Sequence, residues 1–316
     1  MILKKTLIGL MAVTMIYSGV KIYKKPEYMD VLKETAKMKI EAVIDNSPRI
    51  KNNELYMDTH MHLKKPSDYK GIEEIVDKAM EKVDVMVVMI HDTNTSQGLD
   101  YDTFKNKIKE SSKYEIKDYG KYVEIKTKYD SLIAIKAQEL RTNSGRDVLA
   151  IGCDDIIKTN SDVKEVIQEI HKQNGIAIIA HPMSIAKDSF FGINIADENE
   201  RKGLELICYE ADALEEFNSQ NYLWLLYSNV LAESFIKKHN LPGTAGSDTH
   251  YDLEQIGLSG IIVEKDSVSM TDFVGDLKKV IKNKKFKIHK EYTSPVKFGK
   301  VMMFPFLKSK VESLLP

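Results

Sequence analysis

From residue 54 onward, short apolar runs alternate with longer amphipathic stretches, and this alternation is the feature that most constrains the fold. The runs have the length of buried β-strands, whereas stretches such as SDVKEVIQEIHKQN have apolar residues at helical spacing. This alternation predicts a largely parallel sheet with helices outside it, and about seven or eight such units would close into a barrel. The expected strands are LYM (55–57), VDVMVVMI (83–90), SLIAIKA (131–137), VLAIG (148–152), GIAIIA (175–180), LELIC (204–208), GTAG (243–246) and GIIV (260–263).

The N-terminal segment MILKKTLIGLMAVTMIYSGVKIYKK differs in character from the rest of the chain. Lysines flank an apolar stretch from Thr6 to Val20, which is the layout of a signal sequence or a short membrane anchor. A full span needs about 17–25 residues, a length reached only if Ile22 and Tyr23 are included. Because a clear A-x-A cleavage site is absent, we expect residues 1–25 to be an uncleaved anchor, with a cleaved signal peptide or a core helix as alternatives. The protein would then be membrane-anchored or exported, and lysines on both flanks leave its orientation open.

Shifts in pattern give the other domain boundaries. Residues 26–53 predict a helical neck or linker, residues 54–285 the barrel, and residues 286–316 a C-terminal tail. Residues 98–130 are charged and rich in tyrosine, and they do not fit the alternation. We interpret them as a helix and a hairpin inserted between two barrel units, and we expect them to cover the barrel mouth.

Side chains that bind metals follow the apolar runs. In YMDTHMHLKK, Asp58 is followed at two-residue steps by His60 and His62. The C-terminal ends of parallel barrel strands meet at one face, so such groups would crowd together there at a high electrostatic cost without a counter-charge. Divalent cations supply that charge, and mixed imidazoles and carboxylates suit Mn, Zn or Fe better than Ca or Mg. Other residues in such positions are His91, Asp92, Glu139, His181, Glu215, Asn218, Asp248 and His250.

Composition and the absence of certain motifs exclude several classes of protein. The formal net charge of -1 gives no global field that would attract nucleic acid, so we expect no stable nucleic-acid partner. The chain has no Walker A or Rossmann glycine pattern, so we expect no bound nucleotide cofactor. Cys153 and Cys208 lie in or beside apolar runs, which predicts small buried residues rather than a zinc or redox site.

The motifs MDTHMH, IHDTN, AQELRT, IAHP, LEEFNS and TAGSDTH, taken in order, resemble those of the PHP (polymerase and histidinol phosphatase) family of metal-dependent phosphoesterases. The resemblance covers roughly residues 54–265, and D-x-H-x-H, H-P and G-S-D-x-H are its most specific parts. It implies a distorted (β/α)7 TIM-like barrel with a cluster of two or three divalent metal ions at its C-terminal face. It also implies hydrolysis of a phosphate ester by a metal-activated hydroxide. The substrate would be a phosphorylated small molecule or the end of a nucleotide or oligonucleotide.

The resemblance implies that His60 and His62 bind the first metal and that Asp248 completes this site. Glu139 would bridge two metals. Since residues i and i+2 of a strand point to the same side, both rings of His60-x-His62 can reach one ion, and the same holds for Asp248 and His250.

The remaining metal ligands are implied less directly. His91 would lie on a second metal, and His181 and His250 would hold a third. Asp68 is a candidate ligand of the second metal, although SDY stands one residue later than the Ser-Asp-Gly of the family. Asp147 stands where many members have a histidine, and a carboxylate can replace an imidazole at Mn or Fe.

Four residues are expected to act on catalysis without being primary ligands. Asp58 would orient the ligands from outside, and Glu215 with Asn218 would shape the floor of the pocket. Arg141 lies two residues after Glu139, so it would point to the same side and hold a phosphate oxygen.

The sequence leaves two other functions open. One is a non-catalytic, membrane-bound metal-binding module, because Ile90 stands where the family usually has an acid before the histidine. The other is hydrolysis of a non-phosphate substrate by a related metal-dependent barrel. Metal content measured together with phosphoester turnover separates the first alternative from a phosphoesterase.

Overall fold

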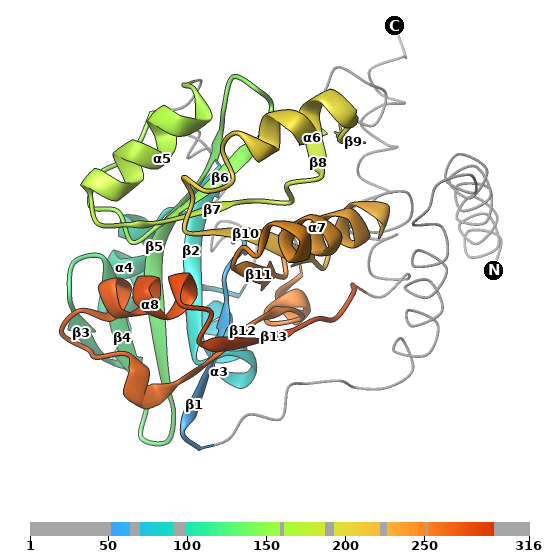
Figure 1. The fold of residues 1–316 in the computed structure, drawn as a ribbon. Helices are drawn as coiled ribbons and strands as arrows, with labels where there is room; N and C mark the ends of the chain where they lie inside the picture. The colour runs from blue at the N-terminus through green and yellow to red at the C-terminus, as the bar shows by residue number, and fades with distance from the viewer. Residues whose placement is uncertain are drawn as a thin grey trace, which may run out of the picture.

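The computed structural model describes residues 52–63, 70–91, 99–158, 161–186, 193–221, 226–250 and 252–293. Within these ranges the chain is a mixed α/β protein whose strands form a nearly closed, barrel-shaped sheet with helices around it (Figure 1). The barrel strands are β1 (Glu54–Asp58), β2 (Val85–His91), β5 (Ser131–Arg141), β6 (Asp147–Ile151), β7 (Ile176–Ile179), β10 (Ala213–Asn218) and β11 (Gly243–Gly246).

Backbone hydrogen bonds just beyond β1 and β11 connect the segments that follow the first and last strands of the barrel. The strands follow the order β11-β10-β7-β6-β5-β2-β1. His62 N then donates to Thr249 O at 2.8 Å, and Asp248 N donates to His60 O at 2.6 Å. The segments that follow the first and last barrel strands therefore lie side by side at one end of the barrel.

One strand distorts the barrel. Parallel pairing joins β1 to β2, β2 to β5, β7 to β10 and β10 to β11, whereas β6 is antiparallel to both β5 and β7. β12 (Gly260–Glu264) pairs antiparallel with β1, and β13 (Phe286–His289) pairs antiparallel with β12. This arrangement fits the predicted TIM-like barrel. It also places β13 within the sheet, in residues that the sequence assigned to the tail.

Local sequence explains why the covering helices form where they do. Asp162 caps α5 by accepting from Lys164 N, and the buried residues of that helix recur at helical spacing. Asp197 and Glu200 form a capping box at the start of α6. The helices are α3 (Ile72–Lys82), α4 (Tyr101–Glu110), α5 (Val163–Lys172), α6 (Glu198–Glu205), α7 (Leu226–His239) and α8 (Phe273–Lys282), with 3₁₀ turns at Leu253–Gln255 and Lys265–Ser267.

The prediction of a strand at residues 204–208 is wrong. Leu204 is the buried residue of α6, and Leu206 is 75% exposed just after that helix ends. The capping box starts a helix at Glu198, and this helix continues into the apolar run, so the first residues of the run are helical rather than extended. The strand of this region is β10, which contains LEEFN, and a short ribbon of β8 (Ser184–Ala186) and β9 (Ile193–Ile195) lies off the barrel.

The inserted segment is a helix followed by a hairpin, as predicted, but the hairpin does not cover the barrel mouth. It consists of β3 (Glu115–Asp118) and β4 (Tyr122–Lys126). A tight turn, in which Thr127 N donates to Asp130 O at 2.8 Å, joins β4 to β5. β4 therefore pairs with residues 131–135 of β5, at the opposite end from Glu139.

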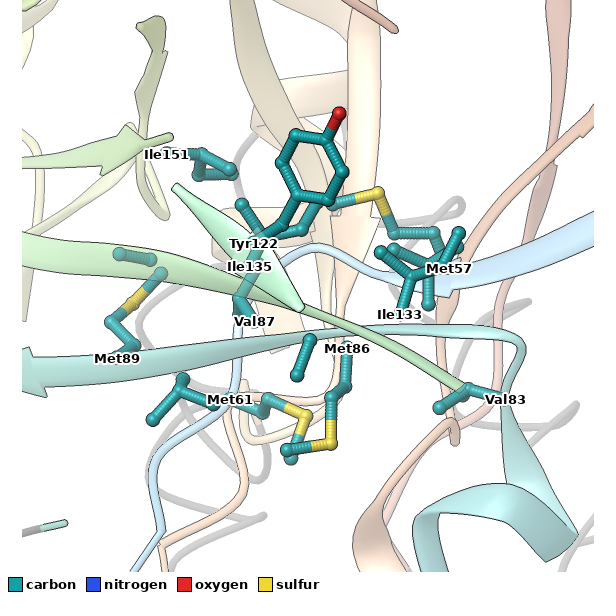
Figure 2. Packing of buried hydrophobic residues seen from close by; sticks show 14 of the residues in the cluster. Met57, Met61, Val83, Met86, Val87, Met89, Tyr122, Ile133, Ile135 and Ile151 are labelled. Carbon is teal, nitrogen blue, oxygen red and sulfur yellow. The ribbon is translucent and has the colours of Figure 1, made fainter. Parts of the chain in front are cut away.

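A core of apolar side chains fills the barrel and the space beneath its helices. Figure 2 shows Met57, Met86, Val87, Ile133 and Ile135 among the side chains that β1, β2 and β5 contribute to one cluster. Burial of such side chains stabilises the fold by roughly 1.5–3 kcal/mol each. The core thereby fixes the strand ends that carry the polar residues of the site.

The predicted anchor and neck, at residues 1–25 and 26–53, lie almost entirely outside the described residues. None of the helices in the described ranges is long and apolar enough to span a bilayer. The anchor therefore remains a prediction from the sequence.

Candidate metal centre

Asp58 joins the ends of three backbone segments at the base of the site. Its carboxylate accepts hydrogen bonds from His60 N at 3.2 Å, Ser247 N at 3.0 Å and Gly257 N at 3.0 Å. The side chain is fully buried, and burial raises its pKa to about 6. These contacts orient the backbone that carries the first two histidines, which fits the orienting position expected for Asp58.

Glu139, near the end of β5, lies at the centre of four imidazole rings. Its Oε2 lies 3.2 Å from His62 Nε2 and 2.8 Å from His91 Nδ1. Its Oε1 lies 3.1 Å from His181 Nε2 and 3.5 Å from His60 Nε2. Burial would raise the pKa of Glu139, but these rings, His60 foremost, hold it well below its usual range.

Asp248 forms the opposite wall of the site. Its Oδ1 lies 3.3 Å from His60 Nε2, 3.6 Å from His62 Nε2 and 3.4 Å from His250 Nδ1. The outer oxygen accepts from Asn218 Nδ2 at 3.0 Å. Asp248 therefore converges on the same histidines as Glu139, although the two residues are more than a hundred positions apart in sequence.

Several ring nitrogens face each other directly. His91 Nε2 lies 3.2 Å from His250 Nε2, and His62 Nε2 lies 3.3 Å from His60 Nε2. The rings of His62 and His91 stack with their centroids 4.0 Å apart. Two imidazole nitrogens at this distance need either a shared proton or a common cation between their lone pairs.

Neighbouring groups of the cluster have pKa values shifted in opposite directions. Burial opposes a charge on His60, but the surrounding carboxylates, Asp248 foremost, raise its pKa well above the usual value. Burial and the adjacent charge of His91 lower the pKa of His62 to about 3. Burial would raise the pKa of Asp248, but His60 and His250 lower it to about 2. Like charges this close cannot all form together, and a divalent cation can replace the protons.

The donor set fits divalent cations. Glu139 Oε2 and Asp248 Oδ1 are buried within ion-pair distance of imidazoles, yet neither has a hydrogen-bond partner of good geometry among the described residues. Potential ligand atoms lie within 4.8 Å of one another in three groups. Group A is His62, His91 and His250; group B is His60, His62 and Glu139; group C is Glu139, Asp147 and His181.

The grouping differs from the one that the family resemblance implied. His250 shares group A with His91, whereas His181 lies in group C, and a metal held jointly by His181 and His250 stays a prediction from the sequence. In group C, burial opposes protonation of His181, but Glu139 and Asp147 raise its pKa to about 9. Asp147 is thus a neighbour of the cluster, as its replacement of a histidine suggested.

Arg141 forms an ion pair with Asp147 of the same chain. Its Nε and Nη2 donate to the two carboxylate oxygens of Asp147, the latter at 2.8 Å. The Arg141 side chain is 41% exposed at the edge of the site. A role in holding a phosphate oxygen remains a prediction, and it would have to operate beside this ion pair.

Glu215 holds the other side of the first histidine. Its Oε1 lies 3.0 Å from His60 Nδ1, while its Oε2 accepts from His181 N at 2.8 Å and Asn218 Nδ2 at 3.1 Å. A carboxylate in this position fixes the tautomer of a ligating histidine so that Nε2 faces the metal. Glu215 thus contacts His60 and Asn218 contacts Asp248, and their position as the floor of the pocket stays a prediction.

Two residues that the sequence indicated as ligands or neighbours of ligands, Asp68 and Asp92, lie outside the described residues.

The sequence did not predict one residue that supports the site. Arg146 is buried, and it donates through Nη1 to Pro182 O at 2.8 Å and through Nη2 to Glu200 O. It therefore holds the turn that contains His181, and nothing in its sequence context marks it for this role.

Two site residues have an unusual backbone conformation. The φ angle is 25° at His181 and 50° at Asp248, in the left-handed region that non-glycine residues seldom adopt. Such conformations cost about 1–3 kcal/mol each and persist where surrounding contacts impose them. At these two positions, the contacts are the hydrogen bonds that His181 N makes to Glu215 and that Asp248 N makes to His60.

The fold and site define a class of protein, an α/β barrel that gathers imidazoles and carboxylates at one end for divalent cations. The family model described as PHP-associated matches residues 227–280, which include Asp248 and His250. This match covers a minor part of the chain and agrees with the family resemblance of its motifs.

Comparison with curated protein sequences gives no significant match. Among solved structures, the lesion-specific endonuclease PfuEndoQ from Pyrococcus furiosus is similar at a TM-score of 0.46 and 16% identity, over 74% of this chain and 57% of that one. Endonuclease Q in complex with a 27-mer duplex containing an abasic lesion gives a TM-score of 0.45 and 14% identity, over 73% and 57%. This chain thus corresponds to little more than half the length of either endonuclease.

Proposed function

We propose that this chain is a metal-dependent phosphoesterase. The observation that carries the proposal is the position of Glu139, whose carboxylate lies within 3.5 Å of ring nitrogens from four histidines at the ends of three strands, β1, β2 and β7. Apolar side chains would fill this space at a lower electrostatic cost than a buried cluster of imidazoles and carboxylates, so the cluster favours a functional explanation. The match to the PHP-associated model supports the same class of chemistry.

The ligands would be shared between neighbouring cations, because His62 belongs to groups A and B and Glu139 to groups B and C. Divalent cations bound there would polarise a phosphoryl group and activate water for attack on phosphorus. Mn, Zn or Fe suits this mixture of nitrogen and oxygen donors.

The residues of the chain prepare the site for that reaction. Asp58 and Glu215 hold His60 through its backbone and through Nδ1, so that Nε2 points to the centre. Asn218 positions the Asp248 carboxylate by donating to its outer oxygen. Because these supports are buried and hydrogen-bonded, the ligand atoms are arranged before any substrate binds.

We propose a phosphorylated small molecule or the end of a nucleotide or oligonucleotide as substrate, on the basis of the family resemblance. The distorted (β/α)7 form of the barrel and a complement of two or three ions belong to the same proposal. Arg141 is partly exposed to solvent, and among the described residues it is the one arginine or lysine that forms an ion pair with a member of group C.

The test is elemental analysis of the purified full-length protein, followed by turnover of aryl phosphomonoesters, aryl phosphodiesters and short oligonucleotides with Mn²⁺ added. We expect His60→Ala and Asp248→Ala to abolish turnover and to lower metal content while the far-UV circular dichroism stays unchanged. His171→Ala is the matched control, because His171 lies on α5 and pairs with Asp212 away from the cluster. Full activity in either cluster variant, or metal binding without turnover of any phosphoester, would argue for a non-catalytic module instead.

A further inference from the structure

Group C differs from the other two groups in having a positive side chain built into it. Arg141 makes two parallel hydrogen bonds to the carboxylate of Asp147, whose side chain is only 4% exposed. Among the described residues, no lysine or arginine forms an ion pair with Glu139 or Asp248, the carboxylates of the rest of the cluster. Of Glu139, Asp147 and Asp248, only Asp147 therefore pairs with an arginine or lysine within the part of the chain that the structure describes.

The local fold makes this ion pair rigid. Arg141 at the end of β5 and Asp147 at the start of β6 are direct cross-strand partners. A tight turn joins the two strands, with Thr142 N donating to Arg146 O at 2.8 Å and Gly145 N donating to Thr142 O at 3.0 Å. A bidentate arginine–carboxylate pair held across such a hairpin has little conformational freedom to lose.

The pair also competes with a metal ion for the same oxygens. Asp147 Oδ2 lies 3.7 Å from His181 Nε2 and accepts from Arg141 Nη2 at 2.8 Å. A metal cation at group C would have to share that carboxylate with the guanidinium of Arg141. The positive charge of the guanidinium would repel the cation. Groups A and B contain no such competitor among the described residues.

We propose that Arg141 is an internal counter-ion that takes the place of a tightly bound cation at group C, so that the protein binds two ions strongly and a third only weakly. This inference rests on the proposed function, since it assumes that groups A and B bind metal. It assigns Arg141 a positioning role toward Asp147, in place of the phosphate contact predicted from sequence.

The experiment counts ions rather than turnover. The full-length protein is stripped with a chelator and then equilibrated with Mn²⁺ by dialysis over a range of concentrations, and bound Mn²⁺ per chain is measured. We expect two tight ions in the wild type. In Arg141→Gln, which removes one positive charge next to the group, the third ion should bind about tenfold or more tightly.

Three further variants separate this explanation from others. Arg141→Lys keeps the positive charge and should retain the wild-type count. The double variant Arg141→Gln/Asp147→Asn lacks both the counter-ion and the ligand, so it should lose the gain of the single variant. Arg201→Gln is the matched control, because Arg201 contacts Ala196 O away from the cluster. Thermal unfolding with and without Mn²⁺ verifies that each variant is folded.

The outcomes distinguish this inference from the proposed function. Wild-type protein that binds no Mn²⁺ would overturn both. A wild type with three equally tight ions, or an Arg141→Gln variant whose third affinity is unchanged or weaker, would overturn the counter-ion role and leave the phosphoesterase proposal intact. A tighter third ion in Arg141→Gln that is absent in the double variant supports it.

Discussion

Replacement of Glu215 by glutamine tests whether the support beneath His60 matters as much as its ligand atoms. Glu215 is buried, and its two oxygens accept from His60 Nδ1, His181 N and Asn218 Nδ2. Glutamine has nearly the same shape, but one of its two terminal atoms is a donor. It cannot accept all three of these hydrogen bonds.

Either orientation of the new amide is unfavourable. With the amide oxygen toward His60, the NH₂ group faces two buried donors, each of which then costs about 1–3 kcal/mol. With NH₂ toward His60, the ring must carry its proton on Nε2, and that nitrogen can no longer bind a metal. We therefore expect Glu215→Gln to lower the free energy of unfolding by about 2–4 kcal/mol, and to weaken metal binding by about 10–100-fold.

The assay combines urea unfolding of the metal-free protein with competition for Mn²⁺ against a chelator of known affinity. Glu216→Gln is the control on the same strand. Its carboxylate pairs with Lys290 Nζ at 2.6 Å near the surface, and an ion pair of this kind contributes about 0–1 kcal/mol. If Glu215→Gln and Glu216→Gln behave alike in both measurements, the supporting role of Glu215 is refuted.

Three other predictions concern the backbone, the protons and the N-terminus. A Cβ at Gly246 would lie 2.4 Å from His60 Cβ and 2.9 Å from its backbone N, so Gly246→Ala should destabilise the protein by about 1–3 kcal/mol and weaken metal binding. Gly243→Ala meets only the movable Glu216 side chain and should be milder in urea unfolding. In the metal-free protein the pKa of His181 is raised from 6.5 to about 9, so its stabilising contribution is complete below pH 6.5 and is lost as the pH rises to about 9. Unfolding in a chelating buffer should show a loss across that window in which the share of His181 is about 3 kcal/mol, and His181→Gln should flatten the profile by that amount; an unchanged profile in this variant would contradict the assignment. Full-length protein should sediment with membranes, and deletion of residues 1–25 should release it, unless the segment is cleaved or packs in the core.

The barrel is predictable from sequence because most strands are short apolar runs that a parallel sheet requires. The sequence did not predict β10 as a strand, because LEEFN contains two acidic residues. The burial of Glu215 depends on partners that are distant in sequence, such as His60. The antiparallel direction of β6 relative to β5 could have been predicted from the short connection between the two strands. Only five residues separate Arg141 from Asp147, and a parallel connection needs a dozen or more. The hairpin of the insertion lies away from the mouth because its turn to β5 is short, which the charged composition did not reveal.

The partition of the ligands could not be predicted, because it follows strand order rather than sequence order. β1 lies beside β2, and the segment after it lies beside that of β11, which brings His62, His91 and His250 together in group A. β5, β6 and β7 are consecutive neighbours, so they supply the three members of group C. Group B joins the two halves, because Glu139 on β5 reaches the histidines that follow β1. A motif lists residues along the chain, whereas a shared cation depends on which strands are neighbours, and that is set by how the apolar core closes the sheet. Arg141 shows the same limit, since its spacing from Glu139 indicates which face it occupies but only the reversed neighbour β6 gives it Asp147 as a partner.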